Sequence, residues 1–377
     1  MSSQPAYPTL FKPKTVRGLR LKNRITMAPL FLGYAAEGGK VSPLLLEHYE
    51  SMAAGGVAMV VVENAAVSVE GSGGPRTLRC DHNRYLGGLT KLAAVIQKQY
   101  CKAALQINHA GRFARTPNPV SASAVPAFGI TPRSLTKTEI RKIRKQFANA
   151  ARRVQKAGFD LVELHGGTGY LLSQFVSPRT NQRSDEYGGS IESRIRFPME
   201  TFQAVKDAVG DFPVGYRLLA DEWLPDGLRP EEAGILAQAL AREGVAYLSV
   251  MGGTYESFFL PGIVTKSRRT LYMTPLAAAI RKKVSVPVIA AGRISTPNLA
   301  EKILREGKAD LIGLARMLWV DPQWPQKARR GRDRAIRKCS PRCDACMQQV
   351  MKGRAAICPR WPKEKRAIYR QRLGDRH

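Results

Sequence analysis

Four cysteines lie close together near the end of the 377-residue chain, at Cys339, Cys343, Cys346 and Cys358. Because the chain has only six cysteines, this grouping is typical of soft-metal ligation rather than of core packing. Disulfides fit less well, since the first three cysteines are crowded and we expect no secretory signal at the start of the sequence. Structural zinc sites usually consist of two separated C-x2-C pairs, whereas the order here is C-x3-C-x2-C-x11-C. The spacing favours a [4Fe-4S] cluster, with zinc as the alternative.

The same region carries much of the basic charge. The chain has a formal net charge of +30, and residues 327–377 contain 17 Lys and Arg against 4 Asp and Glu. A cluster of four thiolates is anionic, so the surrounding cations would ease its reduction and attract an acidic electron-donor protein. A basic solubility tail is the structural alternative. Nucleic-acid binding through a zinc site is a further one, but Trp361 is the only aromatic residue near the loop that could stack on a base.

A second chemically dense stretch covers residues 163–198 and opens with ELHGGTGY. Within it, His165 could stabilise a substrate oxyanion and Tyr170 could donate a proton. The Gly-Gly-Thr-Gly loop could instead cradle a nucleotide phosphate. A third glycine at the dinucleotide spacing and an acidic ribose partner are both missing, which argues against that interpretation.

The elements that must position these residues form a repeating pattern. Short apolar runs alternate with segments of helical periodicity, such as residues 42–54, 135–157 and 296–305. Near-continuous apolar strands that alternate with amphipathic helices predict a parallel sheet covered on both faces. The predicted strands cover residues 24–30, 57–64, 101–107, 161–166, 213–219, 246–253, 286–293 and 310–316.

Eight such units match an α/β fold of the (β/α)8 TIM-barrel class, whose chemistry lies at the carboxyl ends of the strands. We therefore predict a barrel over residues 1–322 and a short basic, cysteine-bearing extension over 323–377. We also predict a cytoplasmic protein without a membrane span, because no apolar run is long enough and the cysteine usage suits a reducing compartment. The predicted strand ends carry Pro29, Glu63, Gln106, His165, Arg217, Gly252, Gly292 and Arg316.

The stretch after the fourth predicted strand resembles the signature of the old yellow enzyme family of FMN-dependent oxidoreductases. That family reads His-x-x-(His or Asn)-Gly-Tyr-Leu, then Gln-Phe-x-Ser-Pro, Asn-x-Arg-x-Asp-x-Tyr-Gly-Gly-Ser and Glu-x-Arg-x-Arg-Phe, which correspond here to residues 165–171, 174–178, 181–190 and 192–197. The likeness continues at LKNRITMAPL, LQINHAGR, YRLLADEWLPDG, AAGRIS and LARMLWVDP. The cysteine loop resembles that of the 2,4-dienoyl-CoA reductase branch, although the first two spacings are exchanged.

The resemblance implies an FMN across the barrel mouth. Gln106 would contact the flavin pyrimidine, and Arg217 would lie near N1 and C2, where a cation stabilises the reduced flavin. The last two strands would hold the phosphate. The full set of implied FMN contacts is Ala28, Pro29, Leu30, Gln106, Arg217, Gly292, Arg293, Ala315 and Arg316.

The resemblance also implies a catalytic set of His165, Thr168 and Tyr170. Thr168 stands where the family usually has a second histidine or asparagine, and Phe31 stands where relatives often have threonine or cysteine. A threonine still donates one hydrogen bond, over a shorter reach. An apolar ring at position 31 removes a hydrogen bond to the flavin and narrows the pocket.

The implied activity is that of an ene-reductase acting on a small unsaturated substrate, such as an enone, an enoate or a CoA thioester. Electrons would pass through the [4Fe-4S] cluster. Because the FAD- and nucleotide-binding portion of the large relatives is not found after the cluster, we expect a separate acidic donor protein, or NAD(P)H acting directly at the barrel mouth. An amine dehydrogenase or demethylase of the same fold is the alternative. The sequence leaves the oligomeric state open, a homo-oligomer included.

Overall fold

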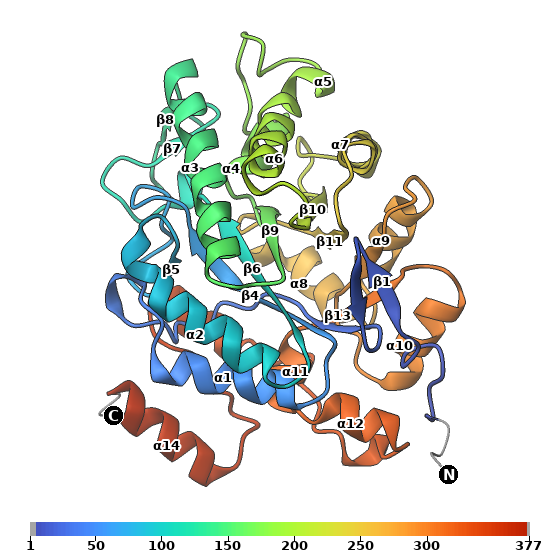
Figure 1. The fold of residues 1–377 in the computed structure, drawn as a ribbon. Coiled ribbons are helices and arrows are strands. Elements are labelled where there is room, and N and C mark those ends of the chain that lie inside the picture. The colour runs from blue at the N-terminus through green and yellow to red at the C-terminus, as the bar shows by residue number, and fades with distance from the viewer. Residues whose placement is uncertain (1–4, 375–377) are drawn as a thin grey trace.

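Eight parallel strands close into a barrel in the computed structural model, which describes residues 5–374 (Figure 1). β3 pairs with both β13 and β4, so the barrel has no free edge. Every strand predicted from the apolar runs is present, and the predicted (β/α)8 class is confirmed. The barrel strands are β3 (Ile25–Met27), β4 (Met59–Ala66), β6 (Lys102–Asn108), β9 (Leu161–Gly166), β10 (Val214–Asp221), β11 (Leu248–Gly252), β12 (Val288–Ala290) and β13 (Leu311–Leu314).

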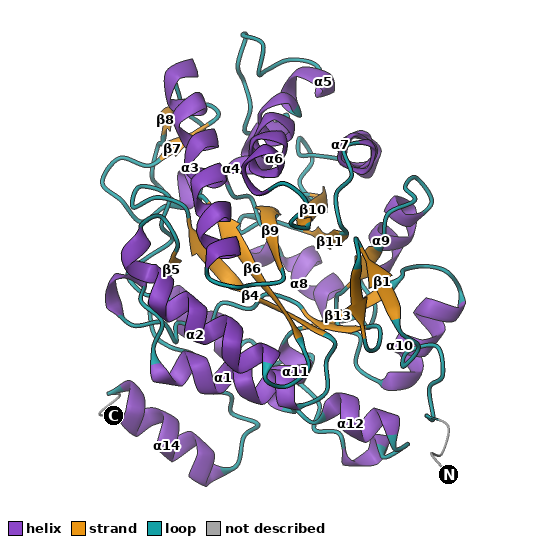
Figure 2. Ribbon diagram, viewed as in Figure 1, coloured by secondary structure: helices purple, strands orange, loops and turns teal. Residues whose placement is uncertain are grey.

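Helices surround the strands on the outside of the barrel (Figure 2). Their starts follow from local chemistry: Ser42 and Thr296 cap α1 and α10, and Thr136 forms a capping box with Glu139 at α3. The helices are α1 (Pro43–Ala54), α2 (Leu86–Gln97), α3 (Lys137–Lys156), α4 (Leu171–Val176), α5 (Ile191–Arg194), α6 (Arg196–Val209), α7 (Pro230–Arg242), α8 (Pro261–Arg268), α9 (Thr274–Arg281), α10 (Pro297–Arg305), α11 (Arg316–Val320), α12 (Trp324–Arg329), α13 (Ala345–Met351) and α14 (Lys363–Leu373).

A hairpin of β1 (Lys14–Val16) and β2 (Leu19–Leu21) precedes the barrel. Its buried Val16 and Leu21 form a core cluster with residues at the amino ends of the strands, among them Met59 and Leu161. The hairpin therefore covers the end of the barrel opposite to the strand ends that carry the polar residues.

The cysteine-bearing extension packs directly on the barrel. The N–H of Ala356 donates to the carbonyl of Leu32 at 2.9 Å, and the Tyr34 hydroxyl donates to the Ala356 carbonyl at 2.7 Å. The indole N–H of Trp361 donates to the carbonyl of Trp319 at 3.0 Å. Ala356, Cys358 and Trp361 belong to the same apolar core as the barrel helices. The boundary between residues 322 and 323 remains a prediction.

Two further features concern the surface. α14 lies near α1 (Figure 1), and its Arg372 makes a two-pronged ion pair with Glu47 of α1 at 2.5 and 2.6 Å. Among residues 5–374, no helix is both long enough and apolar enough to cross a membrane.

Gly33 provides a test of how the extension docks. Its φ of +71° suits glycine, and a Cβ there would lie 3.3 Å from the Cα of Ala355. We expect Gly33→Ala to lower the free energy of unfolding by about 1–2 kcal/mol, because the left-handed backbone and the crowded contact both oppose a side chain. Gly87→Ala is the control, since position 87 is helical and has open space around it. Equal melting temperatures for wild type and Gly33→Ala would contradict the prediction.

Candidate functional site

The barrel mouth brings together the polar residues predicted at the carboxyl ends of the central strands. Gln106 on β6 is in register with Glu163 on β9, and His165 on β9 is in register with Arg217 on β10. All four residues are buried or nearly so. Parallel register therefore fixes their order around the rim.

Glu163 anchors the polar groups beneath the mouth. It accepts hydrogen bonds from the Gln106 amide at 2.7 Å and from the Tyr247 hydroxyl at 2.9 Å. Burial raises its pKa, and the Arg217 guanidinium opposes that rise. Sequence analysis missed Glu163 and Tyr247. The period-two alternation of a strand could have indicated Glu163, because it lies two residues before His165 and shares its face.

Arg217 forms no ion pair with a carboxylate among residues 5–374. Its Nη1 donates to the Ser249 hydroxyl at 3.2 Å and its Nε to the Met251 sulfur at 3.3 Å. Burial lowers its pKa, and Glu163 opposes the effect. A buried cation with weak neutral partners suits the pyrimidine edge of a reduced flavin, so Arg217 and Gln106 fit the group expected there.

His165 is held in one tautomer. The N–H of Gly167 donates to its Nδ1 at 3.2 Å, so the ring proton lies on Nε2, which can donate to a substrate oxygen. Burial, and secondarily Arg217, hold the pKa of His165 well below its usual value, so the ring stays neutral. Its ring lies 4.9 Å from that of Tyr170 in an edge-on arrangement.

Tyr170 pairs with a second tyrosine that sequence analysis missed. The hydroxyl oxygens of Tyr170 and Tyr255 lie 3.0 Å apart. Burial raises the pKa of Tyr170 well above its usual value, so the phenol remains protonated at neutral pH and can serve as a proton donor. No spacing pattern in the sequence indicated Tyr255, which lies in the loop after β11.

Thr168 has a left-handed backbone, with φ +61°, and its hydroxyl donates to the Met251 sulfur at 3.5 Å. The side chain thus shares the Met251 sulfur with Arg217. Thr168 also borders the main cavity. Its direct part in substrate binding remains a prediction.

A cavity of about 570 Å³ opens above these residues. Its lining is largely apolar and comes from the first strand end, the loops after β4, β6 and β11, and the extension. Predicted residues Pro29, Leu30, Phe31, Thr168 and Tyr170 line it, together with Tyr255, Phe113, Met347 and Val350.

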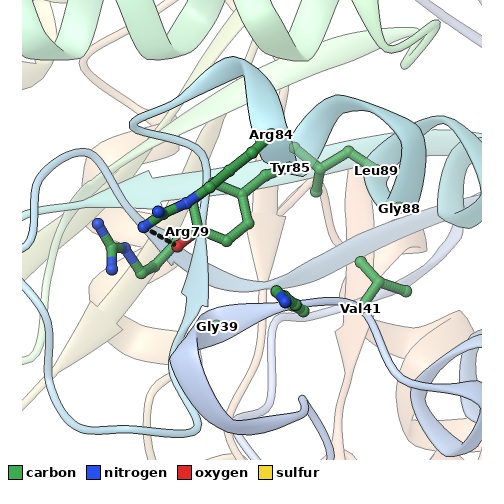
Figure 3. Close-up of a pocket in the computed structure, with 8 residues that line it drawn as sticks. Gly39, Val41, Arg79, Arg84, Tyr85, Gly88 and Leu89 are labelled. Atoms are coloured by element: carbon green, nitrogen blue, oxygen red, sulfur yellow. Dashed lines mark hydrogen bonds between the residues drawn. The ribbon is translucent and has the colours of Figure 1, made fainter.

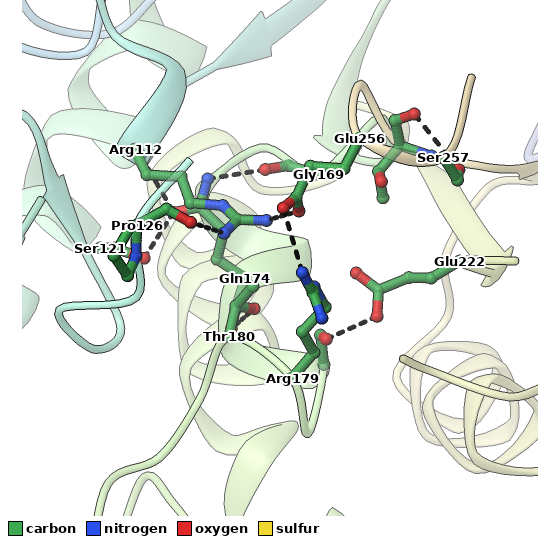
Figure 4. Close-up of polar contacts among 12 residues, drawn as sticks. Arg112, Ser121, Pro126, Gly169, Gln174, Arg179, Thr180, Glu222, Glu256 and Ser257 are labelled. Carbon is green, nitrogen blue, oxygen red and sulfur yellow. Dashed lines mark hydrogen bonds and ion pairs between the residues drawn. The ribbon is translucent and has the colours of Figure 1, made fainter. Parts of the chain in front are cut away.

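A buried ion-pair network holds two of the cavity-lining loops together (Figure 4). Arg112, whose side chain is fully buried, pairs with Glu256, and Arg179 reaches the same carboxylate at 3.3 Å. Glu256 directly follows Tyr255, so the network fixes the loop that carries the second tyrosine. The loss of one partner from a buried pair usually costs several kcal/mol, so we regard Arg112 and Glu256 as positioning residues.

Arg293 and Arg316, which are the predicted phosphate ligands, follow the last two barrel strands. The charge of Arg316 adds to burial in lowering the pKa of Arg293, so the two cations lie near each other. Within residues 5–374 neither has a carboxylate partner, and Arg293 contacts only the carbonyls of Ser267 and Ser340. Gly292 has φ +98°, and a Cβ there would meet Met273 at 2.7 Å. Position 292 therefore requires glycine, and the two neighbouring cations suit a phosphate.

The other implied FMN contacts differ in what they can offer. The N–H of Ala28 already donates to the carbonyl of Leu314 at 2.9 Å, which leaves its carbonyl for a flavin. Pro29 and Leu30 face the cavity. Ala315 immediately precedes α11, next to Arg316.

The four loop cysteines lie in one neighbourhood. Burial raises the pKa of Cys358 to about 11, and the thiols of Cys339, Cys343 and Cys346 add to the rise. Arg316 acts in the opposite sense on the pKa of Cys346. Within residues 5–374, however, no group of three or more His, Cys, Asp or Glu has the arrangement of a metal site. The cluster therefore remains a prediction, while Cys80 and Cys101 are buried as expected.

A separate hollow of about 200 Å³ shares no residue with this site (Figure 3). There the guanidinium groups of Arg79 and Arg84 lie over the ring of Tyr85, at 5.3 and 5.0 Å from its centre. Arg79 is neutralised by Asp81 at 2.5 Å.

The fold and the mouth together match a known family. Residues 9–335 match the model of the NADH:flavin oxidoreductase / NADH oxidase family. The chain belongs to this family. The predicted relationship to the old yellow enzymes is thereby confirmed, and an FMN is the cofactor that the family name and the residues of the mouth both fit.

One protein of similar sequence and two solved structures illustrate the relationship. The chain is 42% identical to an NADH oxidase of Thermoanaerobacter brockii over 344 residues, which is 88% of this chain and 52% of that protein. The structure of a 2-naphthoyl-CoA reductase superposes on this chain with a TM-score of 0.90 at 28% sequence identity. The match covers 95% of this chain and 57% of the reductase chain. For histamine dehydrogenase from Rhizobium sp. 4-9 the TM-score is 0.85 at 29% sequence identity. This match covers 94% of this chain and 52% of the dehydrogenase chain. The chain thus spans about half the length of these family members.

Glu63, predicted at the second strand end, does not join the site. Its buried carboxyl lies near the N–H of Leu32 and the hydroxyl of Tyr49, which accepts from the Glu63 N–H at 2.7 Å. Burial raises its pKa from the ordinary 4.5 to about 8, and those two groups only partly oppose the rise. The folded protein therefore keeps this carboxyl neutral at pH 7.

This burial makes stability depend on pH. Between pH 4.5 and 8 the unfolded chain ionises Glu63 and the folded chain does not, so the group reduces stability as pH rises through this window. We expect the stability of the wild type, relative to Glu63→Gln, to fall by about 1 kcal/mol for each pH unit there. Urea unfolding at several pH values measures this. If the free energies of unfolding of wild type and Glu63→Gln changed equally with pH, the raised pKa of Glu63 would be refuted.

Proposed function

We propose that this chain is an FMN-dependent oxidoreductase that reduces an activated C=C bond in an enone, an enoate or an enoyl thioester. The observation that carries the proposal is the pair of proton donors at the mouth. A neutral His165 with its proton on Nε2 lies beside a protonated Tyr170, and Tyr170 borders a large apolar cavity. The structural similarity to a 2-naphthoyl-CoA reductase supports a CoA thioester as one substrate.

FMN, when bound, supplies the hydride for such a reduction. Gln106 and Arg217 would hold its pyrimidine, Ala28, Pro29 and Leu30 its edge, and Gly292, Arg293, Ala315 and Arg316 its phosphate. Glu163 fixes the Gln106 amide through one N–H and leaves the amide oxygen available.

Each residue at the barrel mouth then has a separate role in the reaction. His165 Nε2–H donates to the substrate carbonyl oxygen and stabilises the negative charge that develops on it. The Tyr170 hydroxyl gives its proton to the α-carbon. Tyr255 donates to the phenolate oxygen that remains, because its hydroxyl lies 3.0 Å away. Thr168 supports the substrate at the side of Met251, and the apolar walls exclude water.

A substitution at Tyr170 tests this assignment. With cinnamaldehyde as substrate, we expect Tyr170→Phe to slow oxidation of the reduced enzyme about 100-fold, since general-acid catalysis is lost. Reduction of the flavin by dithionite should not change, and the flavin spectrum should show that cinnamaldehyde still binds. Stopped-flow absorbance separates the two half-reactions. An enzyme that leaves cinnamaldehyde intact and oxidises a tertiary amine would overturn the proposal in favour of the amine dehydrogenase alternative.

We further propose that electrons enter through a [4Fe-4S] cluster held by Cys339, Cys343, Cys346 and Cys358. The cysteine spacing supports it, as does the electrostatic effect of Cys339, Cys343 and Cys346 on the pKa of Cys358. The surface around the loop is basic, with Lys338, Arg342 and Arg360 all exposed, which suits an acidic donor protein. NAD(P)H acting at the barrel mouth is the competing electron donor. Both donors are compatible with a monomer and with a homo-oligomer.

Metal analysis of protein purified without oxygen tests the cluster. We expect about four irons and four sulfides for each FMN, a stoichiometry set by the cluster type. Cys346→Ser should lose the iron and retain the flavin. Cys101→Ala is the control, because that thiol is buried outside the loop and should leave the iron content unchanged. Protein that contains one zinc and no iron would exclude electron transfer through a [4Fe-4S] cluster.

A further inference from the structure

Three arginines from separate parts of the chain line the cavity without a carboxylate partner. Arg76 follows β4, Arg115 follows β6, and Arg354 comes from the extension just after α13. In the described chain none of the three forms an ion pair. Arg112, which lines the same cavity, is different because Glu256 neutralises it.

The contacts that these side chains do make are long and to neutral groups. Arg76 donates to the carbonyl of Gly33 at 3.5 Å, and Arg115 donates to the carbonyl of Met351 at 3.3 Å. The Arg354 side chain has no hydrogen bond to the described residues. Each guanidinium has five N–H donors, so most of their donors remain available to a ligand.

Arg115 connects this group of cations to the catalytic tyrosines. Its charge opposes the rise in the pKa of both Tyr170 and Tyr255, so the guanidinium lies within electrostatic reach of the two hydroxyls. A Cβ at Gly353 would lie 3.5 Å from Arg115 Nη1, which places Arg115 directly beside the extension. The same cavity is therefore lined by proton donors and by cations that have no carboxylate partner in residues 5–374.

The rest of the cavity wall is apolar. Leu30, Phe31 and Phe113 line it from the barrel, and Met347 and Val350 line it from α13. Burial of an apolar ligand body against these side chains would stabilise binding, whereas a second polar group in the middle of the molecule would be left without a partner.

We propose that the cavity selects an apolar unsaturated molecule that also carries an anionic group, a carboxylate or a phosphate, bound by Arg76, Arg115 and Arg354. This substrate class rests on the proposed ene-reductase function. The assignment makes Arg354, Met347 and Val350 specificity-determining residues, so the cysteine-bearing extension selects the substrate of the barrel to which it is attached.

A matched ligand pair tests the assignment. The probes are cinnamaldehyde with a para-carboxylate and the methyl ester of the same compound, which share the reacting end and differ in charge. Their dissociation constants follow from perturbation of the flavin spectrum of the oxidised holoenzyme. We expect the acid to bind about tenfold more tightly than the ester. Arg115→Gln or Arg354→Gln should raise the dissociation constant of the acid about tenfold and leave that of the ester unchanged. Arg334→Gln is the control, since it removes an exposed arginine outside the cavity.

Several results would overturn the inference. These are equal affinity of acid and ester in the wild type, equal losses for both probes in the variants, or failure of both probes to bind. A loss confined to NADPH, titrated in the same variants, would also overturn it, because the cations would then serve the donor's phosphates. Reduction of the ester by the wild type distinguishes the two proposals: if the ester is reduced but the acid has no advantage, only the present inference fails.

Discussion

The electrostatics of the barrel mouth depend on one arrangement, the burial of Glu163 and Arg217 on neighbouring parallel strands. Each charge partly offsets the effect of burial on the pKa of the other. Glu163 orients Gln106 and Tyr247. Arg217 adds to the burial that lowers the pKa of His165, and it shares the Met251 sulfur with Thr168. The polar groups at the mouth are therefore preorganised in the protein itself, and little reorganisation is needed when a cofactor and substrate arrive.

Strand closure explains why the sequence predicts so much of this site. A parallel barrel places each strand end on one rim, so Gln106, His165 and Arg217 could be grouped from the apolar runs alone. Loops follow no such period. Tyr255 and Glu256 lie in a loop after β11, and their partners Tyr170 and Arg112 are far away in the sequence, so no pattern indicated them. Glu63 shows the opposite error: its position at a strand end predicted a place at the mouth, but its carboxyl faces Leu32 and Tyr49 instead.

The docking of the extension was also beyond sequence reasoning. Composition separated residues 323–377 as a basic segment, and a solvated tail was one interpretation. Instead Ala356, Cys358 and Trp361 are buried in the common core, because Gly33 allows the backbone at Ala355 to approach closely. Helix α13 carries Cys346 at one end and Val350 in the cavity wall, so the proposed electron inlet and the substrate cavity share one short rigid element.

This shared element has a consequence for the order of assembly during synthesis. All eight strands are translated before α13, so they leave the ribosome before the segment that forms the last wall of the cavity. Until residues 347–354 arrive, the cavity lacks the side chains of Met347, Val350, Met351 and Arg354. A barrel truncated before α13 would thus have a more open cavity than the finished chain. The cysteine loop is made in the same late segment, so the proposed metal ligands and the last wall of the cavity become available together.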